Sequence, residues 1–423
     1  MILTYDNYLS ADLDAIPINP EWNMGDKREN RMHTIHAYPA KFPAFITSKA
    51  IKYAVDKQID VQTVADIFCG CGTVAYETVE KNLHFWGCDI NPVATLIARV
   101  KSRSYNRNAI EKGLQCILDI YDNTEVNHYC EEHNNERIRY WFRDEQIDNL
   151  SKLKHSIFQI VIPNEYRDFF LCAFSNILKP CSRWLSKSIK PQIDPVKIEH
   201  EVCSAFKMQV RAMIKANEHN TIINNYLSEI ETVNFLHRNI NQAFADLVVT
   251  SPPYVTSYEY ADLHQLSTLW LGYTNEYRTF REGSIGSLYH SEKFDDNIKK
   301  LNKVGNDVTF KVYTMDKCKA KAVAQYYVDI QNTIKKVNVM LRPNGACLFV
   351  IGNTEYKGVK IDNARHLAET LLENSFFDVE IERRKISNKI LTPYRDKKGK
   401  FTTNKKCRKV YSEEFIIFAK KIA

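Results

Sequence analysis

The tetrapeptide Ser251-Pro252-Pro253-Tyr254 places polar and aromatic groups in a rigid loop. The Ser251 hydroxyl and the Pro252 carbonyl can accept hydrogen bonds, and the two prolines restrict the backbone that carries these acceptors. The loop directly follows an apolar run at 247–249, which is typical of a buried parallel strand. Because α/β folds bind ligands at the carboxyl ends of their strands, this loop is either a strand-ending turn or part of a binding site.

A second candidate site is the loop DIFCGCGT at 66–73. Gly70 and Gly72 allow the backbone to bend sharply and to approach a ligand closely, although a glycine pair also occurs in simple turns. Asp89 ends the next apolar strand, where an acidic side chain can accept hydrogen bonds from ribose hydroxyls. Ala75 replaces the third glycine of a dinucleotide loop, and no GKS or GKT is present. The loop therefore predicts S-adenosylmethionine as the cofactor.

Both candidate sites lie in strand–loop–helix patterns. Apolar runs precede helix-like segments in residues 63–81 and 84–100, and a further apolar strand begins at Asp246. This alternation predicts a parallel, doubly wound α/β sheet. Residues 102–239 are instead charged and poor in glycine, and they contain amphipathic segments of helical length such as 164–179. This region predicts a mostly helical insertion.

The motifs, in this order, resemble those of the S-adenosylmethionine-dependent DNA amino-methyltransferases. The resemblance rests on IHAYPAKFP at 35–43, FCGCGT at 68–73, GCDINP at 87–92 and TSPPY at 250–254. It implies a Rossmann-like class I methyltransferase sheet in which the helical insertion recognises the target DNA. The implied organisation is an N-terminal arm at 1–30, a catalytic domain at 31–101 and 240–423, and the insertion at 102–239.

The resemblance also implies a role for each motif. Asp66 and residues of the first three motifs would bind S-adenosylmethionine, and the acidic residue after the second strand would hold the ribose. These residues are Tyr38, Pro39, Lys41, Phe42, Asp66, Phe68, Gly70, Gly72, Thr73, Asp89 and Asn91. The tetrapeptide would hold the amino group to be methylated, and the expected catalytic residues are Ser251, Pro252, Pro253 and Tyr254.

The exocyclic amine of a base is a poor nucleophile, because its lone pair is delocalised into the ring. Acceptors at Ser251 and Pro252 can draw the nitrogen toward tetrahedral geometry, and the Tyr254 ring can stack on a flipped base. In the family, serine at the first position accompanies N4-cytosine methylation, whereas aspartate or asparagine usually accompanies N6-adenine methylation. We therefore expect a site-specific N4-cytosine enzyme. The alternatives are an N6-adenine DNA methyltransferase, an RNA base amino-methyltransferase and an inactive nucleic-acid-binding protein.

Two cysteine-containing segments offer competing chemistry. Pro180-Cys181 would suit a C5-cytosine enzyme with a cysteine nucleophile, but this pair lies in the helical insertion rather than after an apolar strand. We expect Cys181 to be structural. The stretch 128–133 contains two histidines and a cysteine that could hold a metal ion, although ordinary packing is the expected role. No zinc pattern with CxxC pairs is present, and we expect no metal.

Composition narrows the setting of the protein. The 423 residues are 44% hydrophobic and 26% charged, as in ordinary globular proteins, and a net charge of +7 permits a polyanionic partner without requiring one. The N-terminal segment lacks a secretory pattern, and no apolar run approaches the roughly 18 residues of a membrane span. We expect a cytoplasmic protein that binds DNA, works with a cognate restriction endonuclease and contacts phosphates through the basic loop at 395–409.

Overall fold

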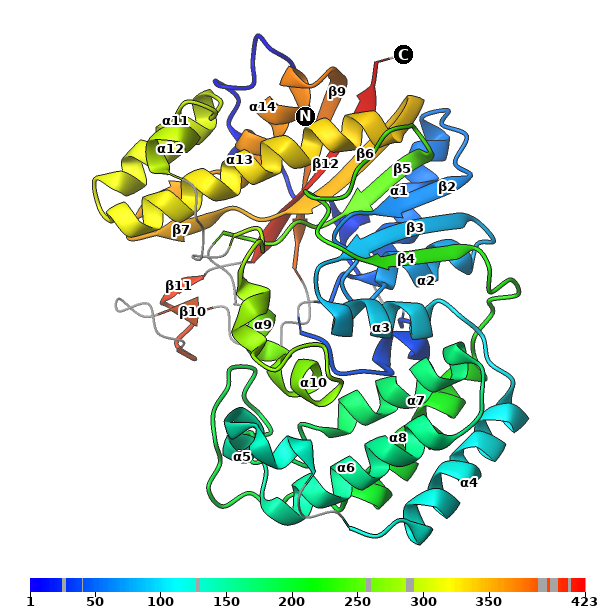
Figure 1. Ribbon diagram of the computed structural model, residues 1–423. Helices are drawn as coiled ribbons and strands as arrows, with labels where there is room; N and C mark the ends of the chain where they lie inside the picture. Colours follow the sequence, from blue (N-terminus) through cyan, green and yellow to red (C-terminus); the bar gives the residue numbers. More distant parts are fainter. Residues whose placement is uncertain are drawn as a thin grey trace.

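The structure is a computed structural model that describes residues 1–24, 28–39, 41–126, 130–255, 260–286, 293–386, 394–395, 402–409 and 412–422 (Figure 1). All the residues expected to bind the cofactor or the amine lie in these ranges. His128 and residues 396–401 of the basic loop lie outside the described residues. None of the described helices combines the length and the apolar composition that a membrane span requires.

A central sheet contains eight of the described strands. They span Ile2–Leu3 (β1), Thr63–Asp66 (β2), His84–Asp89 (β3), Ser228–Thr232 (β4), Ala245–Thr250 (β5), Leu341–Ile351 (β6), Phe376–Lys385 (β9) and Glu413–Lys421 (β12). Their order in the sheet is β1-β9-β12-β6-β5-β2-β3-β4. Strands β4, β3, β2, β5 and β6 pair in parallel, and β12 lies antiparallel between β6 and β9. This is the predicted Rossmann-like α/β sheet of class I methyltransferases.

Helices cover both faces of this sheet (Figure 1). One face packs against Ala44–Asp56 (α1), Thr73–Val79 (α2) and Pro92–Lys101 (α3), and the other against Lys303–Tyr313 (α12), Lys317–Met340 (α13) and Asn363–Glu373 (α14). Along β6, Leu348 and Val350 join the first core, whereas Phe349 and Ile351 join the second. Because both faces are buried, the strand reads as a continuous apolar run.

The helices after α3 lie together beside the sheet (Figure 1). They span Arg107–Asn123 (α4), Glu136–Trp141 (α5), Asp144–Gln159 (α6), Asn164–Ile177 (α7) and Val202–Asn217 (α8). The prediction extended the helical insertion to residue 239, but β4 lies within that range and pairs in parallel with β3 at the sheet edge. Its sequence SEIET has no apolar run, because this edge strand is only partly buried. The sequence pattern therefore did not reveal it.

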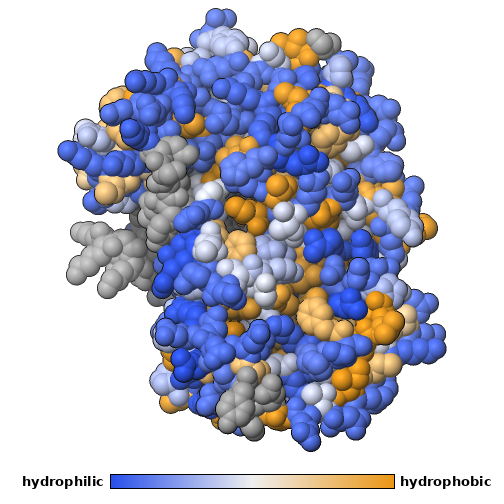
Figure 2. Space-filling view, viewed as in Figure 1, coloured by the Kyte–Doolittle hydropathy of each residue, from blue (hydrophilic) through white to orange (hydrophobic). Residues whose placement is uncertain are grey.

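The remaining elements are short and connect these layers. They are the helices Tyr260–Leu263 (α9), Gln265–Trp270 (α10) and Phe294–Ile298 (α11), the strands Thr354–Tyr356 (β7), Val359–Ile361 (β8), Tyr394–Arg395 (β10) and Arg408–Lys409 (β11), and the 3-10 helices Leu13–Ala15 (η1), Pro20–Trp22 (η2), Arg31–Thr34 (η3), Glu131–Asn134 (η4) and Tyr277–Arg281 (η5). The face shown in Figure 2 is mainly hydrophilic, with smaller hydrophobic areas. In the N-terminal arm, β1 pairs with β9, and Leu3 and Leu13 are buried.

Candidate active site

The carboxyl ends of four neighbouring strands meet at one edge of the sheet. Asp66 ends β2, Asp89 ends β3, Thr250 ends β5 and Ile351 ends β6. Strands β3, β2, β5 and β6 are adjacent and parallel. The glycine loop, Asp89 and the tetrapeptide are therefore brought to the same edge, where open α/β sheets bind their ligands.

The glycine loop has a backbone that only glycine adopts without strain. Gly70 and Gly72 both have positive φ angles, of 48° and 73°. A Cβ at Gly72 would lie 2.6 Å from the Cα of Ala98, so a side chain there would displace α3. The Asp89 carboxylate fixes the loop by accepting hydrogen bonds from the backbone N–H of Gly70 (2.9 Å) and of Asn91 (2.8 Å).

Several groups in this loop retain the capacity to bind a polar ligand. Each oxygen of the Asp89 carboxylate accepts one of the two backbone bonds, and a carboxylate oxygen can accept a second donor. The buried hydroxyl of Thr73 has no hydrogen-bond partner among the described residues. The Asn91 Oδ1 is already used, because it caps α3 by accepting from the Val93 N–H. This set of groups fits the hydroxyl-rich and amino-acid ends of S-adenosylmethionine.

Asp66 connects the glycine loop to the strand that carries the tetrapeptide. Its Oδ1 accepts hydrogen bonds from the Thr250 hydroxyl (2.6 Å) and from the Phe68 N–H (3.1 Å). Burial raises the pKa of Asp66 to about 7 and that of Asp89 to about 6. Sequence reasoning missed Thr250, although its position directly before the tetrapeptide could have indicated this contact.

The Ser251 hydroxyl is oriented by the neighbouring strand. Its Oγ donates a hydrogen bond of 2.9 Å to the Val350 carbonyl in β6. Since the single hydroxyl proton is used in this bond, the oxygen lone pairs remain as acceptors. Pro252 is buried beside it, and Pro253 is partly buried. The tetrapeptide thus holds a fixed acceptor at the sheet edge.

Tyr254 is held by residues that the motifs did not reveal. Its ring packs on Gly352, where a Cβ would lie only 3.4 Å from Tyr254 Cε2. Its hydroxyl donates to Glu414 Oε1 at 3.3 Å, and Glu414 Oε2 accepts from the buried Arg384 at 2.9 Å. Arg384 and Glu414 come from β9 and β12, far along the chain and outside any recognisable motif. Only the fold brings them to the tetrapeptide.

The segment 35–43 approaches the glycine loop through Tyr38. The Tyr38 ring stacks on His264, with ring centroids 4.8 Å apart and planes at 23°, and a side chain at Gly70 would begin 3.8 Å from Tyr38 Cε1. The Lys41 ammonium pairs with Glu29 at 3.0 Å and donates to the His33 carbonyl. Among the other expected residues, the partly buried Phe42 and Phe68 pack against the two hydrophobic cores, and Pro39 is partly buried.

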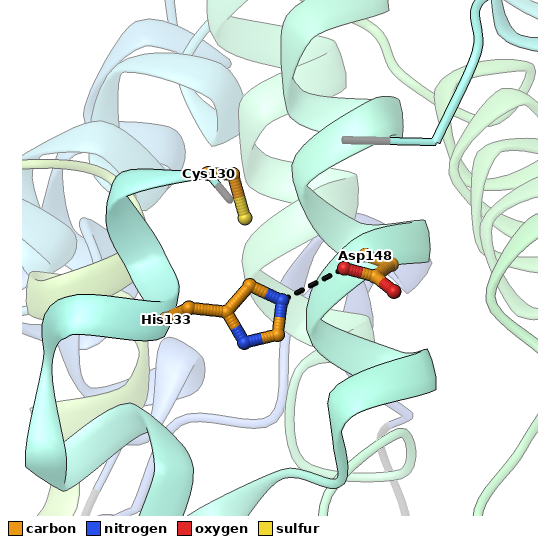
Figure 3. Close-up of side chains that lie close together, drawn as sticks. All are labelled: Cys130, His133 and Asp148. Atoms are coloured by element: carbon orange, nitrogen blue, oxygen red, sulfur yellow. Dashed lines mark hydrogen bonds and ion pairs between the residues drawn. The ribbon is translucent and has the colours of Figure 1, made fainter. Parts of the chain in front are cut away.

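A separate cluster in the insertion contains Cys130, His133 and Asp148, whose potential ligand atoms all lie within 4.8 Å of one another (Figure 3). His133 Nε2 lies 2.7 Å from Asp148 Oδ1, which is a direct hydrogen bond. Two ligands of one tetrahedral zinc ion would lie about 3.4 Å apart, given metal–ligand distances of about 2.0–2.1 Å. Burial also raises the pKa of the Cys130 thiol. The geometry is that of a hydrogen-bonded contact between η4 and α6.

Comparison with known proteins identifies a relative whose sequence matches most of this chain. The type II methyltransferase M.MvaI of Kocuria varians is 24% identical over 392 residues, which cover 84% of this chain and 84% of that protein. The type II methyltransferase M.MjaII of Methanocaldococcus jannaschii is 30% identical over 99 residues, which cover 23% of this chain and 17% of that protein. No family model matches the sequence.

Solved structures show only distant similarity. A SAM-dependent methyltransferase from Methanosarcina mazei overlays with a TM-score of 0.29 and 9% identity, covering 87% of this chain and 97% of that one. The rRNA methyltransferase AviRa from Streptomyces viridochromogenes overlays with a TM-score of 0.28 and 9% identity, covering 91% and 88%. These values are too low to support an inference about activity.

The sequence motifs, the sheet topology and the similarity to M.MvaI all point to the same family. The glycine loop and the tetrapeptide lie at one edge of a class I sheet. The similarity to M.MvaI extends across most of the chain, beyond the motifs themselves. The resemblance to the DNA methyltransferases is thereby confirmed, and together these findings support an S-adenosylmethionine-dependent methyltransferase.

Proposed function

We propose that the chain is a site-specific DNA methyltransferase that methylates the exocyclic N4 amine of cytosine in a flipped base. The observation that carries this proposal is the hydrogen bond from Ser251 Oγ to the Val350 carbonyl, because it leaves the serine oxygen as an acceptor for an amine. The similarity to a type II methyltransferase favours a modification enzyme that works beside a restriction endonuclease.

In this proposal the glycine loop and Asp89 bind the cofactor. The positive φ angles at Gly70 and Gly72 let the backbone approach it. The Thr73 hydroxyl, which has no partner within the described part of the chain, can bind one of its polar groups. Asp89 accepts hydrogen bonds from the ribose while it continues to fix the loop. Tyr38 covers the loop from the side of the 35–43 segment. When bound, S-adenosylmethionine supplies a methyl group on a positively charged sulfur.

The tetrapeptide prepares the amine. Ser251 Oγ and the Pro252 carbonyl accept the two N–H groups, which localises the nitrogen lone pair and directs it away from the ring. The Tyr254 ring, supported by Gly352 and Glu414, stacks on the extruded base. Because the acceptors are held by the sheet rather than by the ligand, little reorganisation is needed when the base enters.

The choice of base rests on the first residue of the tetrapeptide. Ser251 is a neutral acceptor, and serine accompanies cytosine in the family that the motifs resemble. N6 of adenine is the alternative target of the same site, since its exocyclic amine presents the same pair of N–H groups.

The test of the substrate class is methyl transfer from labelled S-adenosylmethionine to mixed-sequence duplex DNA and, in parallel, to total RNA. We expect label in duplex DNA and none in RNA. Label confined to RNA would contradict the proposal and favour an RNA base methyltransferase. Binding of S-adenosylmethionine without transfer to either polymer would instead favour a nucleic-acid-binding protein without activity.

A further inference from the structure

Helices α7 and α8 of the insertion bind the backbone of the segment that leads to Tyr38. Gln209 Nε2, on α8, donates to the Ile35 carbonyl at 2.7 Å, and Asn176 Oδ1, on α7, accepts from the Ala37 N–H at 2.9 Å. The two side chains are also joined to each other, because Asn176 Nδ2 donates to Gln209 Oε1 at 2.8 Å. One pair of amides therefore fixes both sides of residue 36.

His36 extends this contact to the helix that follows the tetrapeptide. Its Nε2 lies 2.9 Å from Ser175 Oγ, and Ser175 Oγ donates to Ser267 Oγ at 2.8 Å. Because the Ser175 proton is used toward Ser267, Ser175 must accept from a protonated His36 Nε2. Desolvation lowers the pKa of His36, so the ring is neutral and carries its single proton on Nε2. The chain of contacts joins α7, the 35–37 segment and α10.

The next residue along this segment reaches the cofactor loop. Tyr38 lies between His264 of the α9–α10 junction and the glycine loop at Gly70. The position of its ring is set by the backbone at 35–37, and that backbone is held by Asn176 and Gln209. If the segment were not held, a cofactor would have to order its backbone on binding, and the entropy lost in doing so would weaken the affinity.

We propose that Asn176 and Gln209 are positioning residues of the cofactor site, so that the insertion helps to bind S-adenosylmethionine whatever its role in target recognition. This role of the two amides rests on the proposed function in one respect, which is the assignment of Tyr38 to the cofactor site. Helices α7 and α8, which the sequence analysis expected to recognise DNA, would then also be needed for cofactor binding.

The test is the dissociation constant for S-adenosylmethionine, measured by calorimetry on the full chain without DNA. Asn176→Ala and Gln209→Ala should each raise it about 10-fold, the loss expected when one hydrogen bond and its ordering are removed. The double variant should be less than additive, because the two amides contact each other. Gln115→Ala is the matched control, since this exposed amide on α4 bonds only Asp119 among the described contacts.

Conservative variants separate hydrogen bonding from loss of folding. Asn176→Asp keeps the acceptor for the Ala37 N–H but loses the donor to Gln209 Oε1, so it should lose less affinity than Asn176→Ala. Gln209→Glu loses the donor to the Ile35 carbonyl and should lose as much affinity as Gln209→Ala. Turnover at saturating cofactor should change less than 2-fold in folded variants, because these residues act on binding. Affinity in both alanine variants equal to that of Gln115→Ala would overturn the proposal. Tyr38→Ala distinguishes a failure of this proposal from a failure of the assignment of Tyr38 to the cofactor site. Weak binding in this variant alone would support that assignment and refute only the role of the two amides.

Discussion

The sheet edge and the helical insertion contribute to the site in different ways. At the sheet edge, Asp89 is the last residue of β3 and Ser251 directly follows β5, and both are held by backbone groups of adjacent segments. In the insertion, Asn176 and Gln209 lie within helices and hold a segment that is 139 and 174 residues away in sequence. The groups proposed to do the chemistry are thus local features of strand ends, whereas the groups that support them are distributed over the chain.

The largest effect should come from the sheet edge. Ser251→Ala removes the fixed acceptor and should lower the turnover number on the order of 100-fold, as for loss of one preorganised hydrogen bond in a transition state. The dissociation constant for S-adenosylmethionine should stay within about 2-fold, since the Ser251 hydroxyl bonds the Val350 carbonyl of β6 rather than the glycine loop. Single-turnover methyl transfer and calorimetry measure the two quantities. Ser186→Ala, at an exposed serine of the insertion, is the control, and equal turnover in the two variants would refute the role of Ser251.

A smaller effect, on cofactor binding, is expected when the Asp89 carboxylate that holds the glycine loop is removed. Asp89→Ala breaks the charged hydrogen bonds to Gly70 and Asn91 and should weaken binding of S-adenosylmethionine about 30-fold, corresponding to about 2 kcal/mol. Turnover at saturating cofactor should fall much less. Asp56→Ala, an exposed carboxylate on α1, should bind as wild type does. A variant at Asp89 with unchanged affinity would show that the cofactor does not use this loop.

The support of Tyr254 should matter less again. Tyr254→Phe removes the hydrogen bond that orients the ring and should lower kcat/KM about 5-fold. Glu414→Gln weakens this bond and also the ion pair with the buried Arg384, so it should lower kcat/KM at least as much. The double variant should lose little more than either single variant. Glu413→Gln is the matched control, because Glu413 is adjacent in β12 but pairs with Arg383 instead. Fully additive losses would mean that the hydroxyl and the carboxylate act independently.

The last prediction concerns the pH dependence of folding stability rather than binding or turnover. The pKa of Asp66 is raised from 3.8 to about 7 by burial, so the folded state binds this proton more tightly than the unfolded state does. Stability should therefore fall as pH rises from about 4 to about 7, by on the order of 1 kcal/mol per pH unit. Asp66→Asn should remove this decline while it keeps an acceptor for Thr250. The free energy of unfolding, measured by urea denaturation at pH 5, 6 and 7, tests this prediction. An equal decline with pH in the variant and in wild type would contradict the raised pKa of Asp66.

The same contrast explains what could be predicted from the sequence. Apolar runs followed by Asp66, Asp89 or Ser251 indicate strand ends, and parallel strands bring these ends to one edge whatever separates them in sequence. β4 escaped prediction because a half-buried edge strand has no apolar run. Arg384, Glu414 and His264 escaped because each is an ordinary residue in its local segment. Their relation to the tetrapeptide and to Tyr38 arises only from strand order and helix packing.

The most direct test of the central claim is the identity of the methylated nucleoside. Duplex DNA modified by the protein with S-adenosylmethionine is digested to nucleosides and analysed by mass spectrometry. We expect N4-methylcytosine, because the hydrogen bond from Ser251 Oγ to the Val350 carbonyl leaves the serine oxygen free to accept a hydrogen bond from an exocyclic amine. N6-methyladenine would retain the amine chemistry and correct the base. The formation of 5-methylcytosine would contradict the account, because that product requires attack by a cysteine and leaves the amine untouched.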